Sequence, residues 1–206
     1  LKEDFSADKI ISVNSKNATD DKQITLSILP DIVYAFIDVF EVYKINKKLF
    51  TLYKKYTAYL SSAKRHNHAC KALIEKINSL SDQDDAIEER NFLVLCLYYL
   101  SGYIIECSLK FKIFEVCNYD ENIDITEEEC RNLGINYKKD IRIHNFEKLQ
   151  NFMDSLNIGI SYISGNSKID NLLNNWKPDL RYEHNTLDYT SIHEMYNHTI
   201  QFLRQM

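Results

Sequence analysis

The stretch Leu100-Ser-Gly-Tyr-Ile-Ile-Glu-Cys-Ser-Leu-Lys110 sets the architecture of this chain. It continues an almost wholly apolar run that begins at Phe92. Gly102, Glu106 and Lys110 are four residues apart, so in a helix they form one polar seam on a single face. A buried charge without a partner is costly. The sequence therefore predicts a buried central helix in which Glu106 and Lys110 require partners.

The composition predicts an all-α protein. Of the 206 residues, 45% are apolar and 27% are charged, as in ordinary soluble globular proteins. Neither Gly nor Pro occurs from Asp31 to Ser101, so little in that half interrupts a helix. We expect a helical bundle of four to six helices over residues 29–206. Residues 1–28 are polar and are expected to form a short hairpin or a loose tail.

The cysteines and the apolar run indicate a cytoplasmic protein. Five cysteines, an odd number without a CxxC pair, are typical of free thiols in a reducing compartment. The run from Phe92 to Ile105 is broken by Ser101 and Gly102 and is too short for a membrane span. The histidines and cysteines have no zinc-like spacing, and no glycine-rich phosphate loop occurs. We expect no metal, no cofactor and no membrane contact.

Helix boundaries follow from the apolar spacing and the capping residues. One helix is expected from Pro30-Asp31 to about Leu80 with a bend, and the central helix from the polar break at 78–85 to about Val116. A loop over 118–125 should precede a short helix. The remaining predicted helices are one capped by Thr126 and Glu129 and ending at Gly134, one from Phe146 to Leu156 closed by Gly159, one over Ile169–Trp176 stopped before Pro178, and a last one opened by Ser191 and Glu194.

The segment from Lys44 to Lys71 runs against the charge of the chain as a whole, which is −5. It holds eight positive residues and no acid, and on a helical wheel six of the eight fall within about a third of the circumference. Such a face suits a phosphate backbone. A solvated helix face, or pairing with the acidic stretches 82–89 or 120–129, are the alternatives. The candidate nucleic-acid-binding residues are Lys44, Lys47, Lys48, Lys54, Lys55, Arg65 and, further along the chain, Lys139.

Three motifs then follow in order along the chain. Gly102-Tyr-Ile-Ile-Glu-Cys-Ser-Leu-Lys110 lies in the central helix, His144 leads into a leucine-containing helix, and Trp176-Lys-Pro-Asp-Leu-Arg-Tyr182 comes next. Over roughly residues 85–206 this order resembles the HEPN family. The resemblance implies a bundle of four or five helices that is usually dimeric. Many members are metal-independent ribonucleases of toxin–antitoxin pairs or antiviral defence, and others are binding or structural domains.

The catalytic signature of that family is an arginine, four to six residues, and then a histidine. Here the corresponding positions before His144 hold Tyr137, Lys138 and Lys139, whereas Arg142 is only two residues away. A lysine cation lacks the planar fork with which arginine grips two oxygens. The chain therefore departs from the signature on which nuclease activity depends.

Metal-free RNA cleavage needs a proton acceptor, a proton donor and a cation near the phosphate. We expect His144 to be the acid/base, because histidine titrates near neutral pH. The candidate cations are Arg142, Lys139 and Arg181, while Glu106 and Lys110 would orient the other groups. Purely structural roles are the alternative: His144 bonding local backbone, Glu106 and Lys110 forming a plain pair, and Arg181 anchoring its loop on the Glu106 carboxylate.

The sequence thus predicts an RNA-interacting HEPN-like protein, a candidate metal-independent endoribonuclease that acts as a toxin or antiviral effector. A homodimer is expected by analogy, as is an antitoxin or defence-system protein as partner. The alternative is a catalytically silent HEPN-like module that dimerises, docks a partner or senses a small molecule in a pocket lined by Glu106, Lys110 and Arg181.

Overall fold

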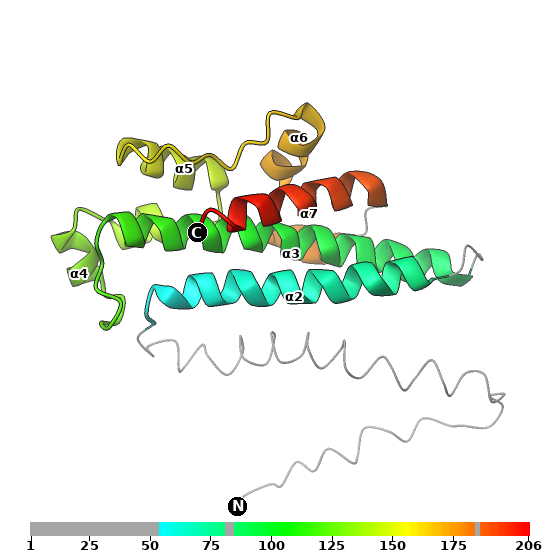
Figure 1. Cartoon of the computed structure of the whole chain (residues 1–206), viewed down its shortest axis with the longest axis horizontal. Coiled ribbons are helices and arrows are strands. Elements are labelled where there is room, and N and C mark those ends of the chain that lie inside the picture. Colours follow the sequence, from blue (N-terminus) through cyan, green and yellow to red (C-terminus); the bar gives the residue numbers. More distant parts are fainter. Residues whose placement is uncertain (1–53, 81–84, 184–185) are drawn as a thin grey trace, which may run out of the picture. The chain divides into compact units, whose positions relative to one another are not determined.

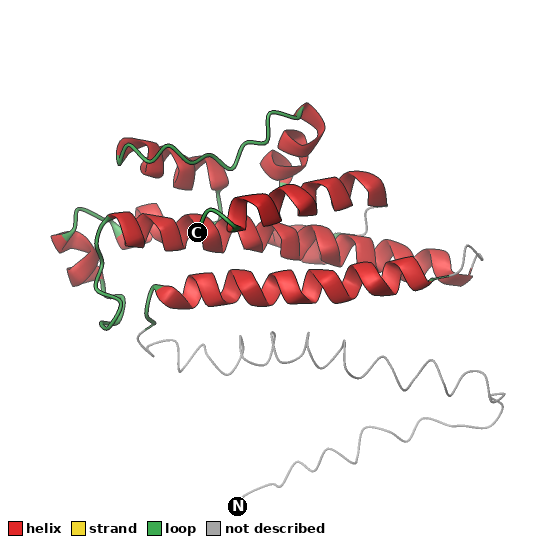
Figure 2. Cartoon of the chain, in the orientation of Figure 1, coloured by secondary structure: helices red, strands yellow, loops and turns green. Residues whose placement is uncertain are grey.

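The structure is a computed structural model that describes residues 54–80, 85–183 and 186–206. Within these ranges all regular elements are helices and no strand occurs, so the predicted all-α class is confirmed. Figure 2 shows helices joined by loops, the longer of which span residues 117–126 and 156–166. The predicted hairpin or tail at 1–28 and the first part of the predicted helix from residue 30 lie outside the described residues.

The long helix α3, Asp85–Val116, forms the centre of the bundle. Helices α2, Thr57–Ser79, and α7, Tyr189–Leu203, flank it, as the cyan and red ribbons of Figure 1 show. α5, Phe146–Ser155, and the 3-10 helix η3, Pro178–Tyr182, also pack against α3. Because α3 is enclosed on several sides, its apolar residues do not form a single stripe. Its largest fully buried side chains include Leu97, Ile104, Ile105, Leu109, Ile113 and Phe114.

The remaining elements are short. They are α4, Glu127–Asn132, the π-helix η2, Tyr137–Ile141, and α6, Ser167–Asn175. By length and composition α3 contains a segment, Ala86–Val116, that could cross a membrane, but this segment is mostly buried inside the bundle. Burial by neighbouring helices is what a core helix requires.

Several predicted boundaries hold. The Thr126 hydroxyl accepts a hydrogen bond from the Glu129 amide at 3.1 Å and so caps α4. Gly134, just beyond the end of α4, has a φ of 75°, the left-handed conformation that glycine adopts without steric cost. α6 ends at Asn175, before Pro178, as predicted.

Two predicted helix ends were wrong. α7 begins at Tyr189 rather than at Ser191, because the Asp188 carboxylate accepts from the Ser191 amide at 2.8 Å and from its hydroxyl at 2.6 Å. A carboxylate is an effective N-cap, and here it takes the place expected of Ser191. α5 is closed by Asn157, whose φ is 58°, rather than by Gly159. Asparagine tolerates this left-handed conformation better than most residues.

Trp176 fixes the segment that leads into α5. Its ring stacks on Phe146 with centroids 4.8 Å apart and meets Tyr103 edge-on at 5.0 Å. Its indole N–H donates to the Tyr99 carbonyl at 3.0 Å. These contacts hold the first residue of α5 close to the middle of α3, and therefore also position His144, two residues earlier.

Candidate acid–base site

Glu106 and Lys110 form a buried ion pair one turn apart on α3. Lys110 Nζ lies 2.7 Å from Glu106 Oε1, and the side chains are 6% and 5% exposed, respectively. The predicted pairing is therefore present in the interior. Each charge has its partner within the same helix, which reduces the penalty of burying either one.

His144, in the loop before α5, also contacts Glu106. Its Nδ1 lies 2.8 Å from Glu106 Oε2, while 46% of the histidine side chain remains exposed. The next residue, Asn145, caps α5 by accepting from the Lys148 amide at 2.8 Å. His144 is thus held by the site on one side and by the start of a helix on the other, and it still reaches solvent.

Glu106 is a carboxylate rather than a neutral acid. Burial would raise its pKa, but the hydrogen bond with His144 and the charge of Lys110 outweigh burial and hold the pKa below its ordinary value. An ionised carboxylate only accepts hydrogen bonds, so Nδ1 of His144 must carry the proton. No described residue bonds to Nε2, the other ring nitrogen. Nε2 is therefore the ring nitrogen that remains without a partner among the described residues.

Positive charge is in excess around this group. The pKa of Lys54, just before α2, is lowered first by burial and then by the nearby charges of Lys110 and Arg65. Arg65 donates to the Ser62 hydroxyl at 3.0 Å, and neither Lys54 nor Arg65 forms an ion pair with a described residue. Three cations therefore face one buried carboxylate. Such a cluster costs stability and favours an anion brought in from outside.

Tyr59 lies between two of these cations. Its ring centroid is 4.7 Å from Lys54 Nζ and 5.9 Å from Lys110 Nζ. Burial, followed by the effects of Tyr137, including a hydrogen bond with it, raises the pKa of Tyr59 well above its ordinary value. The neutral phenol therefore presents its π-face to both ammonium groups, an attractive cation–π geometry.

A second histidine, His66, also lies next to Tyr103. The ring of His66, on α2, is 5.5 Å from the Tyr103 ring, and that of His144 is 6.5 Å from it. Burial and the adjacent charge of Arg65 lower the pKa of His66 to about 4. His66 is therefore neutral at physiological pH, and sequence reasoning did not assign it to the site. Its only signal was its place beside Arg65 in the basic segment.

Arg181 does not join this group, which corrects the predicted pairing with Glu106. Its guanidinium lies over the Tyr182 ring at 4.7 Å and interacts with Tyr99. Both Glu106 oxygens are already occupied, by Lys110 and His144. The predicted Glu106–Arg181 pair is therefore not formed, and a pocket lined by Glu106, Lys110 and Arg181 stays a prediction.

The other predicted cations are dispersed. Arg142 and Lys139 are exposed, Lys139 within η2 and Arg142 at its end. Lys55 is exposed before α2. Lys44, Lys47 and Lys48 lie outside the described residues. Because α2 begins only at Thr57, Lys54 and Lys55 do not share a helical face with Arg65 in the way the wheel assumed.

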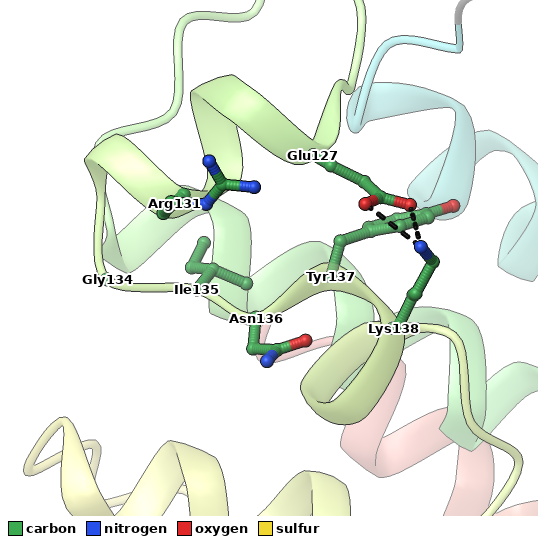
Figure 3. A pocket seen from close by; sticks show the side chains of 7 residues that line it. All are labelled: Glu127, Arg131, Gly134, Ile135, Asn136, Tyr137 and Lys138. Carbon is green, nitrogen blue, oxygen red and sulfur yellow. Dashed lines mark hydrogen bonds and ion pairs between the residues drawn. The ribbon is translucent and has the colours of Figure 1, made fainter.

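An open pocket of about 360 Å³ lies beside η2. Figure 3 shows the Lys138–Glu127 ion pair at its edge, with the Tyr137 side chain pointing towards the ribbon of α2. The residues that line it are Glu127, Arg131, Gly134, Ile135, Asn136, Tyr137 and Lys138. Through Tyr137 and Tyr59, η2 is tied to the cation cluster.

Across the described ranges, no group of three or more His, Cys, Asp or Glu side chains is placed to hold a metal ion. No family model, curated protein or solved structure matches the chain. The resemblance to the HEPN family therefore remains a prediction.

Proposed function

We propose that Glu106, Lys110 and His144 form a metal-independent acid–base site that cleaves RNA. The observation that carries this proposal is the Glu106–His144 hydrogen bond. It holds a partly exposed imidazole by Nδ1 and leaves Nε2 open, beside an excess of positive charge. A carboxylate that accepts from Nδ1 in this way fixes the tautomer of the ring and leaves Nε2 available as an acid or base.

The reaction would proceed by internal transfer. Nε2 of His144 takes the proton of a ribose 2′-hydroxyl, and the 2′-oxygen forms a bond to the neighbouring phosphorus. The bond from phosphorus to the 5′-oxygen breaks, and that oxygen takes a proton from the protonated imidazole of a second copy of the chain. The products are a 2′,3′-cyclic phosphate and a free 5′-hydroxyl. Lys54, which is exposed, would stabilise the charge on the phosphate oxygens directly, and the buried Lys110 would add to the positive potential around them.

This proposal differs from the family's signature in the source of its cations. Lysines from α3 and from the segment before α2 take the place of the missing arginine. We propose, again from the resemblance, that the protein works as a homodimer in the cytoplasm, with an antitoxin or defence-system protein as its regulator.

The test is chemical. Purified protein is incubated with RNA in excess EDTA, and the ends of the products are identified. The proposal expects cyclic phosphate and 5′-hydroxyl ends, and no cleavage of the same sequence made as DNA, which lacks the 2′-hydroxyl. Products with 5′-phosphate ends, or cleavage of DNA, would reject this mechanism.

A silent binding module is the second candidate, and one observation favours it. Glu106 is fully engaged by Lys110 and His144, so the same three residues also satisfy each other as a structural unit. Absence of cleavage by a folded protein that still binds RNA would favour this alternative.

A further inference from the structure

Two aromatic side chains on neighbouring elements are unusually exposed. Phe92 on α3 is 60% exposed, although Leu93 and Val94 beside it are buried, and Tyr182 on η3 is 70% exposed. Single exposed apolar residues are common and carry no meaning alone. Tyr182, however, is linked to α3 through Arg181 and Tyr99.

Arg181 joins the two elements. Its guanidinium carbon lies 4.7 Å from the centroid of the Tyr182 ring, and the guanidinium interacts with Tyr99 on α3. Tyr99 follows Phe92 by seven residues, about two helical turns or ~10 Å along the same face of α3. Phe92 therefore shares a face of α3 with Tyr99, the residue that Arg181 contacts, and we call Phe92, Arg181 and Tyr182 the aromatic strip.

The aromatic strip leads to the candidate site. The Tyr99 and Tyr103 rings are 5.0 Å apart, and the Tyr103 ring is 6.5 Å from that of His144. A chain of ring contacts thus runs from the exposed strip to the imidazole. Both ends carry positive charge without a described acidic partner, Arg181 at the strip and Lys54 beside Glu106.

We propose that the aromatic strip binds the unpaired nucleotides that flank the bond cleaved at His144. Exposed rings beside cations are the pattern by which proteins hold single strands: bases stack on the rings and phosphates contact the cations. A duplex hides the faces of its bases and cannot stack in this way. The choice of RNA as ligand rests on the proposed function, whereas the preference for an unpaired strand rests on the strip.

The test measures binding in a protein that carries His144→Ala, so that no cleavage occurs. The probe is a fluorescent, unstructured RNA of about ten nucleotides, used alone and annealed to its complement. We expect the unpaired strand to bind at least ten-fold more tightly than the duplex. Phe92→Ala and Tyr182→Ala should each weaken binding by about five-fold to one-hundred-fold, the range of one stacking contact.

Matched controls separate stacking from other effects. Ile163, 46% exposed, lies on the loop between α5 and α6, so Ile163→Ala should leave binding unchanged. Phe92→Trp and Tyr182→Trp should retain binding, because a larger ring still stacks. Circular dichroism and thermal unfolding confirm that each variant is folded.

Three results would overturn the inference: equal binding of strand and duplex, unchanged affinity in both alanine variants, or no binding of the unpaired strand. A fourth is a fall in sedimentation mass caused by Phe92→Ala, which would make the strip an interface between copies of the chain. None of these results depends on cleavage. If the wild-type protein does not cleave RNA but the strip variants lose RNA binding, the proposed reaction is rejected and the binding role of the aromatic strip is supported.

Discussion

The indole of Trp176 fills the space that a side chain at residue 102 would occupy. A Cβ built on Gly102 would lie 2.0 Å from Trp176 Nε1, far closer than any contact allows. The missing side chain lets Trp176 reach the Tyr99 carbonyl and stack on Phe146. The glycine of the central motif and the tryptophan that follows α6 are therefore two halves of one contact.

Replacing Gly102 by alanine should destabilise the protein. Alanine favours a helix by about 1 kcal/mol over glycine, but displacing the indole should cost more, giving a net loss of about 1–3 kcal/mol. Urea unfolding measures the difference. Gly159→Ala is the matched control, since a Cβ there meets nothing within 4 Å. Equal stability of the two variants would show that Trp176 does not occupy this position.

Removing the buried carboxylate of Glu106 should lower the free energy of unfolding, because it leaves the charge of Lys110 without a partner. Glu106→Leu strands the ammonium of Lys110 in the interior, and we expect a loss of about 3–5 kcal/mol. Adding Lys110→Met should restore most of that loss, because the buried charge is gone. Glu115→Leu, which breaks the more exposed Lys112–Glu115 pair, should change stability by less than about 1 kcal/mol. An additive double variant would contradict the predicted coupling.

The protein should lose stability as the pH is lowered, and His66 should account for part of that loss. Its pKa is about 4 in the folded protein against 6.5 ordinarily. Below pH 6.5 the unfolded chain takes up a proton that the folded chain does not, so stability is lost as the pH falls from about 6.5 towards 4. The loss should be on the order of 2 kcal/mol at pH 5. Urea unfolding at pH 7 and pH 5 measures it.

His66→Gln should remove this part of the pH dependence, and His68→Gln, at an exposed position on the same helix, should not. The lowered pKa of Glu106 acts in the same direction but at lower pH, because that carboxylate contributes stability above its unfolded pKa and loses it as the pH falls further. If stability depends on pH in the same way in His66→Gln as in the wild type, the imidazole of His66 is not buried as its lowered pKa requires.

Two adjacent lysines should differ in their effect on RNA. Both are exposed just before α2, but Lys54 interacts electrostatically with Lys110 and Glu106, whereas no described interaction with these two residues involves Lys55. Lys54→Gln should slow RNA cleavage at least ten-fold, because it removes a cation near the phosphate. Lys55→Gln should do little beyond a small change in the salt dependence of binding. Equal effects would indicate diffuse attraction by surface charge rather than a site.

Local pattern in the sequence predicted the helices better than the contacts between them. The apolar run around Leu97 and Ile104 requires a buried helix, and α3 is that helix. The Glu106–Lys110 pair followed from i,i+4 spacing alone. The placement of Arg181 was wrong because it depends on how an exposed 3-10 turn meets α3, and no local pattern encodes that meeting.

The π-helix η2 also had no usable signal. Two contacts stabilise it. The Asp140 carboxylate accepts a hydrogen bond from the Asn136 amide at 2.7 Å, and Tyr137 forms a hydrogen bond with Tyr59 on α2. The first contact is short-range but depends on an uncommon helix geometry. The second contact joins residues that are far apart in the sequence, so the sequence did not predict that Tyr59 belongs to the site.

The rate of RNA cleavage by His144→Ala, relative to wild type and in excess EDTA, tests the central claim most directly. If Nε2 of the imidazole held by Glu106 moves the proton, the rate should fall by about 10²–10⁴-fold, while His68→Ala should cleave at the wild-type rate. Cleavage by His144→Ala at the wild-type rate would contradict the account.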